Sequence, residues 1–188
     1  ASLLGTRHHE VLCSSADVRA HLPEVVWHCE TPLLRTAPVP MFLLSGLVRD
    51  TGIKAVLTGE GADELLAGYS IFQEDRVRRC WARQPGSEAR PALFERVHDF
   101  VGTGAQRGGL MWRAFYGRGL QATDDPFYSH AIRWQNTAWT TRLLARDVRG
   151  AAPADAVRAA VAAALPPGFH DFSALGRAQA IEIASFLS

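Results

Sequence analysis

Acidic residues gather in one short turn of the chain, after Gly59. The segment continues Glu-Gly-Ala-Asp-Glu, so that Glu60, Asp63 and Glu64 place three carboxylates beside two glycines. Glycine lets backbone N–H groups come close to an anion, and a helix N-terminus favours negative charge. Because three carboxylates repel a bare phosphate, a divalent cation is the natural mediator. The residues themselves therefore predict a magnesium-bridged phosphate site, with one carboxylate free for chemistry.

Residues on either side of this turn predict the elements that hold it. Residues 53–58 are apolar and β-branched and follow Gly52, which is typical of a buried parallel strand. A strand that enters a helix through a glycine turn is where open α/β sheets bind ligands. The plain alternative is that Asp63 and Glu64 only complement the dipole of the helix. That helix is indicated by apolar residues at helical spacing, at Leu65, Leu66, Tyr69 and Phe72.

The residues before this strand extend the α/β pattern. Ser14 and Asp17 have the spacing of a capping box at a helix start. Prolines make residues 27–40 an irregular connector, after which Pro40 suits the first turn of a second helix that ends near Gly52. The order helix, strand, turn and helix indicates one crossover unit of an α/β sheet.

Two adjacent histidines, His8 and His9, stand before Glu10 near the start of the chain. Neighbouring side chains point in different directions on a strand or a helix, so we do not expect them to bind one metal ion together. We favour a structural role for both over a catalytic one.

Beyond the turn the pattern is mainly helical. The helix that begins near Glu64 is predicted to run to Arg83 and to be broken by the Pro-Gly-Ser at residues 85–87. Asp124 and Asp125 precede a proline and indicate a turn, so we assign them no chemistry. Further helices are expected at residues 91–101, 111–116, 153–165 and from 171 onward, with a glycine-rich link at 102–109. We divide the chain into an α/β part at residues 1–84 and a helical part at residues 85–188.

Composition excludes several classes of protein. The 188 residues are 47% hydrophobic and 21% charged, as in a globular domain, and the net charge of +1 offers no patch for nucleic acid or an anionic membrane. No apolar run reaches the length of a membrane-spanning helix. The three cysteines are odd in number and widely spaced, which is typical of reduced thiols in the cytoplasm. We therefore expect a cytoplasmic protein without nucleic-acid or membrane partners.

The segment from Thr58 to Tyr69 reads Thr-Gly-Glu-Gly-Ala-Asp-Glu-Leu-Leu-Ala-Gly-Tyr. It resembles the Ser-Gly-Glu-Gly-(Ala/Ser)-Asp-Glu-(Leu/Val)-Phe-Gly-Gly-Tyr signature of the asparagine synthetase family. The Gly-Thr-Arg-His-His-Glu run at residues 5–10 and the Glu-Thr-Pro at residues 30–32 resemble family segments in the same order. Asp-Pro-Phe-Tyr-Ser-His at residues 125–130 resembles a linker of one branch of the family.

This resemblance implies an ATP-dependent ligase of two parts. A glutaminase domain releases ammonia from glutamine, and a synthetase domain with the sheet of PP-loop ATPases (a nucleotide α-hydrolase-like fold) adenylates a small-molecule carboxylate before ammonia displaces AMP. By the resemblance, Asp63 binds the Mg²⁺ on the pyrophosphate, Thr58 and Gly59 face the ATP, and Glu60 is the catalytic acid or base. Thr58 keeps the hydroxyl of the family serine, whereas Leu66 and Ala67 replace its Phe-Gly pair.

Other family motifs are absent from these 188 residues. There is no Ser-Gly-Gly-x-Asp-Ser loop to grip ATP, and no N-terminal cysteine to hydrolyse glutamine. Lys54, the one lysine, belongs to the predicted strand and does not match the catalytic lysine of the family. We therefore expect a fragment truncated at both ends, inactive without its partners. These partners are the glutaminase domain and the rest of the synthetase domain, and homo-oligomers are possible.

Two alternatives stay open. The first is a relative that closes a β-lactam or lasso-peptide ring with an internal amine, although Glu60 favours the branch that uses ammonia. The second is a non-catalytic scaffold or split subunit that binds a partner through its helices.

Overall fold

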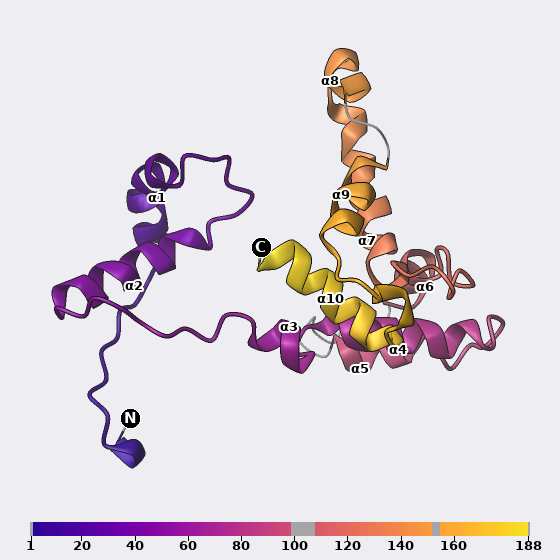
Figure 1. Ribbon diagram of the computed structural model, residues 1–188, viewed down its shortest axis with the longest axis horizontal. Helices are drawn as coiled ribbons and strands as arrows, with labels where there is room; N and C mark the ends of the chain where they lie inside the picture. The colour runs from indigo at the N-terminus through magenta and orange to yellow at the C-terminus, as the bar shows by residue number, and fades with distance from the viewer. Residues whose placement is uncertain (1, 99–107, 152–154, 188) are drawn as a thin grey trace. The chain divides into compact units, whose positions relative to one another are not determined.

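The computed structural model describes residues 2–98, 108–151 and 155–187 (Figure 1). The chain divides into two compact units, Ala1–Thr58 and Gly59–Ser188. The predicted division of the synthetase domain at residues 84 and 85, which lie in the turn after a helix, stays a prediction.

The predicted α/β fold class is wrong for this structure. Every regular element in the described ranges is a helix, and none of those residues belongs to a strand (Figure 1). Residues 53–58, predicted as a buried parallel strand, have no regular structure and are exposed, Leu57 fully so at 103%. A strand is stable only when neighbouring strands pair with its backbone N–H and C=O groups. No described segment pairs with residues 53–58, so their β-branched composition does not produce a strand here.

The first unit contains a single helical turn, η1 (Ser2–Leu4), and two helices, α1 (Ser15–Cys29) and α2 (Pro38–Asp50). The predicted capping box is confirmed, because the Asp17 N–H donates to Ser14 Oγ and the Ser14 N–H donates to the Asp17 carboxylate. The two helices pack together, and Phe42 of α2 lies against the rings of His21 and His28.

The second unit is a bundle of short helices. The helix predicted from Glu64 to Arg83 is interrupted, because Ala67 adopts a left-handed conformation at φ 58° and ends the first piece. The break predicted at residues 85–87 is confirmed. The predicted link at 102–109 and the predicted helix start at Pro153 lie largely outside the described residues. The elements are α3 (Ala62–Leu66), α4 (Ser70–Ala82), α5 (Leu93–Val97), α6 (Gly108–Tyr116), α7 (Tyr128–Ala138), η3 (Trp139–Leu143), α8 (Arg146–Ala151), α9 (Ala156–Ala164), η4 (Phe169–Asp171) and α10 (Ala174–Phe186).

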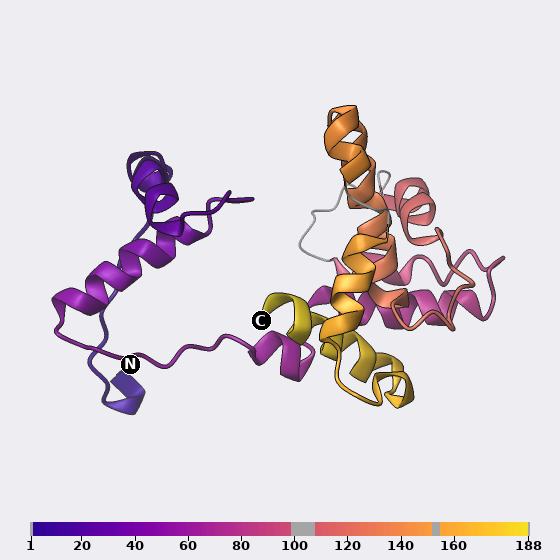
Figure 2. The same ribbon diagram turned by 45° about the horizontal axis from the view of Figure 1, so that its top comes forward.

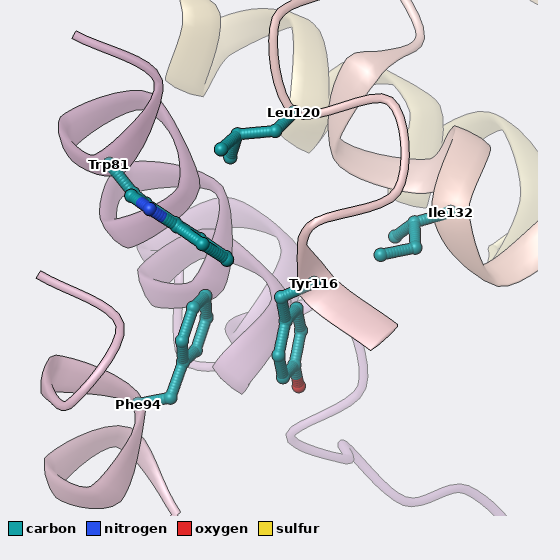
Figure 3. Packing of buried hydrophobic residues seen from close by; sticks show 5 residues of the cluster. All are labelled: Trp81, Phe94, Tyr116, Leu120 and Ile132. Carbon is teal, nitrogen blue, oxygen red and sulfur yellow. The ribbon is translucent and has the colours of Figure 1, made fainter. Parts of the chain in front are cut away.

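Three apolar clusters hold this unit together. The first joins α4 to α7, and in Figure 3 the rings of Phe94 and Tyr116 face each other, with centroids 3.9 Å apart. The second joins α10 to η4 and the start of α7 through Ile181, Phe169 and Phe127. The third lies between α4 and α10. As a result α10 lies against both α3 and α4, which both views of the ribbon show (Figures 1 and 2). The full first cluster is Trp81, Phe94, Tyr116, Leu120 and Ile132 (Figure 3).

A buried arginine closes the irregular stretch between α6 and α7. Arg78 of α4 donates hydrogen bonds to the carbonyls of Tyr116, Arg118 and Tyr128, at 3.2, 2.8 and 2.9 Å. Burial lowers the pKa of Arg78 from its usual value. Saturating three carbonyls with one buried cation stabilises the loop without a regular element. None of the described helices has the length and apolar character to cross a membrane.

Candidate functional site

The acidic turn has a defined backbone geometry. The Ala62 N–H donates to the Gly59 carbonyl at 3.2 Å, and Gly61 has φ 89° and ψ −10°. These are the values of a type II β-turn with Glu60 at its outer corner. The third position of such a turn needs a positive φ, which glycine adopts without strain. Gly61 is therefore required by the backbone, and Glu60 is presented to solvent.

The three carboxylates of the segment fall into two environments. Glu60 and Asp63 are exposed, whereas Glu64 is buried, with 2% of its surface accessible. The Tyr69 hydroxyl donates a hydrogen bond to Glu64 Oε1 at 2.8 Å, and this bond to the carboxylate raises the pKa of Tyr69 to about 12. Glu64 is therefore buried and hydrogen-bonded to Tyr69, and of the three carboxylates only Glu60 and Asp63 are exposed to a ligand.

Gly68 governs the direction of the Asp63 side chain. A Cβ atom at position 68 would lie 2.0 Å from Asp63 Oδ1 and 3.0 Å from its Cγ, so the carboxylate occupies the space that any other side chain would need. The Gly68 N–H also donates to the Asp63 carbonyl at 2.9 Å. This role of Gly68 was not predicted, because it depends on the rotamer of a residue five positions earlier.

Helix α10 supports the turn from a distant part of the chain. Gln179 Nε2 donates to the carbonyls of Glu64 and Leu65, at 3.2 and 2.8 Å. Leu187, just after α10, places Cδ1 3.4 Å from the position of a Cβ on Gly61. These contacts join residues more than a hundred positions apart, and no spacing rule in the sequence could have identified them.

The exposed carboxylates suit a Mg²⁺ ion shared with phosphate better than a metal ion enclosed by protein side chains alone. Among the described residues no group of three or more His, Cys, Asp and Glu side chains could enclose a metal ion. Mg²⁺, however, is held in many sites by one or two carboxylates together with phosphate oxygens and water. Exposed Asp63 and Glu60 fit that arrangement. The predicted contribution of a helix dipole is weak, because α3 has only five residues.

The other predicted residues belong to the first unit. Thr58 is the last residue of the first unit, and the acidic turn of the second unit begins at Gly59. His8 and His9 are exposed residues of the first unit, and His8 Nε2 lies 3.7 Å from Glu10 Oε2. A cleft of about 510 Å³ in the first unit is lined by none of the predicted site residues. The structure thus places Gly59 and Glu60 on one turn and Asp63 on the helix α3 that follows it.

Comparison with known proteins gives this turn a context. The family model described as asparagine synthase matches residues 1–167. The chain is 45% identical to asparagine synthetase [glutamine-hydrolyzing] 2 of Arabidopsis thaliana over 76 residues, which are 39% of this chain and 13% of that protein. It is 42% identical to a putative asparagine synthetase [glutamine-hydrolyzing] of Mycobacterium tuberculosis (strain ATCC 25618 / H37Rv) over 74 residues, which are 39% of this chain and 11% of that protein.

A third relative, the asparagine synthetase [glutamine-hydrolyzing] of Triphysaria versicolor, is 41% identical over 76 residues, again 39% of this chain and 13% of that protein. The chain therefore aligns with only 11–13% of the length of these relatives. No solved structure matches it. Because the family model covers most of the 188 residues, the chain belongs to the asparagine synthase family.

Proposed function

We propose that this chain contributes the acidic turn to the synthetase site of an asparagine synthetase-like, ATP-dependent amide ligase. One observation carries the proposal. Two carboxylates of the family signature are exposed, Glu60 on the turn and Asp63 in α3, whereas the third, Glu64, is buried and accepts a hydrogen bond from Tyr69. Because Glu64 is buried, two exposed acids remain, one to hold Mg²⁺ and one to accept a proton.

Asp63 is assigned to the leaving group. Attack of a carboxylate on the α-phosphate of ATP builds negative charge on the departing pyrophosphate, and a bound Mg²⁺ would stabilise that charge. Asp63 is the residue that would hold the ion, with water and phosphate oxygens as the other ligands. Gly59, the first residue of the turn, and Thr58 before it would face the nucleotide.

Glu60 is assigned to the second half of the reaction. It occupies the outer corner of the turn and is exposed, so it can accept a proton from the amine that attacks the acyl-adenylate. Ammonia released from glutamine is the amine that the names of the relatives suggest. An internal amine, as in ring-forming relatives, would require the same proton transfer.

The remaining parts of the site come from outside these 188 residues. The sequence holds neither the loop that grips ATP nor the cysteine that hydrolyses glutamine, so the rest of the synthetase domain and a glutaminase domain are the required partners. We expect the 188-residue chain alone to release no pyrophosphate from ATP. Measurable release would overturn that expectation.

Two substitutions in the full-length protein separate the two assignments. Asp63→Asn should slow carboxylate-dependent pyrophosphate release about a hundredfold, since it removes the carboxylate that would hold the Mg²⁺ on the leaving group. Glu60→Gln should leave pyrophosphate release intact and slow amide formation by about a hundredfold or more, the usual contribution of a general base. Glu95→Gln, at an exposed acid of α5, is the control and should change neither rate. A scaffold without catalytic function would show no effect of any of the three.

A further inference from the structure

We infer that Gln179 of α10 is a positioning residue for the acidic turn, because its side-chain amide fixes the short helix that carries Asp63. The inference deepens the proposed function and rests on it for the meaning of the turn. Two hydrogen bonds from Gln179 tie α10 to α3.

The helix α3 is weak by itself. This helix has five residues, and helices of that length are not stable in water without tertiary support. The last carbonyls of a helix also have no partner within the helix. Gln179 satisfies two of them, those of Glu64 and Leu65, through the two hydrogens of one amide nitrogen.

Residues of α10 and Leu187 after it contact α3 at its end and Gly61 before its start. Gln179 binds the end of α3, whereas Leu187 approaches Gly61 before its start. Between them, the ring of Phe186 lies 6.4 Å from that of Tyr69, the residue that engages Glu64. Because α10 and Leu187 contact α3 near both of its ends, they restrict the rotation of α3 as well as its distance from α10.

The helix α10 is itself held in place by contacts with α7 and η4. Glu182 Oε1 lies 3.0 Å from His130 Nε2 of α7, and the other ring nitrogen of His130 lies 2.8 Å from Ser129 Oγ. All three side chains are buried. Next to Glu182, Ile181 is fully buried in the cluster with Phe127 and Phe169. Loss of the Gln179 amide would therefore detach the end of α3 from α10, while α10 itself keeps its position.

The test uses the full-length protein and three variants. Gln179→Ala keeps a residue with high helix propensity in α10 and removes both hydrogen bonds. Gln179→Lys restores a donor of similar reach, and Gln135→Ala removes an exposed glutamine of α7 as the matched control. One measurement is hydrogen exchange of the Leu65 and Gly68 amides, which donate to the carbonyls of Gly61 and Asp63. The other is the affinity for Mn²⁺ with pyrophosphate, followed by the Mn²⁺ electron paramagnetic resonance signal, with Asp63→Asn as the reference.

We expect Gln179→Ala to accelerate exchange of these two amides about tenfold or more, the effect of losing two hydrogen bonds, with exchange in α10 unchanged. Affinity for Mn²⁺ with pyrophosphate should fall about fivefold or more, because α3 no longer holds Asp63 in one position. Gln179→Lys should restore most of the slow exchange and most of the affinity. Gln135→Ala should match the wild type.

Each other outcome decides a separate point. Wild-type exchange in Gln179→Ala would overturn the inference. Faster exchange with unchanged affinity would make Gln179 a structural cap and would also overturn its positioning role. If the wild type and Asp63→Asn bind Mn²⁺ with pyrophosphate equally, the proposed role of Asp63 fails, whereas the exchange data still decide whether Gln179 holds α3.

Discussion

At the scale of single residues, the hydrogen bond from Tyr69 to Glu64 separates one carboxylate of the turn from its neighbours. All three tyrosines of the chain have a pKa above the ordinary value, Tyr69 through Glu64, and Tyr116 and Tyr128 through burial. A raised pKa in the folded state means stabilisation that is complete below the unfolded pKa of about 10 and is lost as pH rises through the folded pKa.

The Glu64 carboxylate should therefore be visible in a tyrosine titration. Glu64→Gln keeps the shape and an acceptor but removes the charge, so the pKa of Tyr69 should fall from about 12 toward its ordinary value. At about pH 11 the variant should show close to one additional tyrosinate per chain in ultraviolet absorbance. Glu60→Gln, at the exposed corner of the turn, is the control. Superimposable titrations of the wild type and Glu64→Gln would contradict the bond.

A second residue-scale prediction concerns acid. Arg158 binds both oxygens of Asp125, at 3.0 and 2.6 Å, and the Phe127 N–H donates to the same carboxylate. Burial alone would raise the pKa of Asp125, but the hydrogen bonds from Arg158 and Phe127 lower it below the ordinary 3.8. The stabilisation is thus present above pH 3.8 and is lost as pH falls through the folded pKa.

Substitution of this aspartate should flatten the acid response of stability. Between about pH 6 and pH 3, the free energy of unfolding of Asp125→Asn in urea should decline less than that of the wild type. Asp124→Asn, at the exposed neighbouring residue, should follow the wild type. An equal decline in all three proteins would show that the pair with Arg158 adds no pH-dependent stability.

Residue types and spacing alone point to the acidic turn but not to the contacts that shape it. The order of Gly59, Glu60 and Asp63 drew attention to the turn, and its roles in binding and catalysis stay predictions. The burial of Glu64 beside Tyr69 and the space that Gly68 leaves for Asp63 depend on side-chain conformation, which a motif does not encode. Gln179 lies in an unremarkable helix, and only tertiary packing brings it to the turn.

At the scale of elements, α3 is followed closely by Gly68, where the Asp63 side chain leaves no room for a Cβ atom. Gly68→Ala would push a Cβ into Asp63 Oδ1, so the carboxylate must move and α3 must adjust. We expect a loss of about 1–3 kcal/mol in stability, as for other overpacked sites, with weaker binding of Mn²⁺ and pyrophosphate by the full-length protein. Thermal unfolding and metal titration would measure the two effects.

A glycine in open space provides the control for that substitution. Gly46 lies within α2, and a Cβ there would meet no atom within 4 Å. Gly46→Ala should therefore stabilise α2 by about 0.5–1 kcal/mol through helix propensity. If Gly68→Ala behaved like Gly46→Ala, the close approach of Asp63 to Gly68 would be wrong.

Elements that depend on nearby residues were the ones that sequence predicted well. The capping box of Ser14 and Asp17 spans three positions, and the structure confirms it. The strand at residues 53–58 was predicted wrongly because a strand needs partners that lie elsewhere, and none of the described segments supplies one. The helix after the turn was predicted too long, since helical spacing continues across Ala67 although its backbone is left-handed there.

At the scale of the whole molecule, the chain consists of two units joined through exposed, irregular residues. Residues 51–60 are all exposed, and residues 53–59 have no regular structure. The apolar clusters described above are built entirely from residues of the second unit. We therefore expect the second unit to fold by itself.

Lys54 provides a direct test, because it is the one lysine in the sequence and lies exposed in this connection. A lysine-specific protease should cut the native 188-residue chain once and rapidly, separating residues 1–54 from residues 55–188. Since its clusters stay intact, the longer fragment should keep the thermal transition that circular dichroism detects in the uncut chain. Lys54→Arg should resist the protease and provide the control. Slow cleavage, or a cut fragment without cooperative unfolding, would show that the two units stabilise each other.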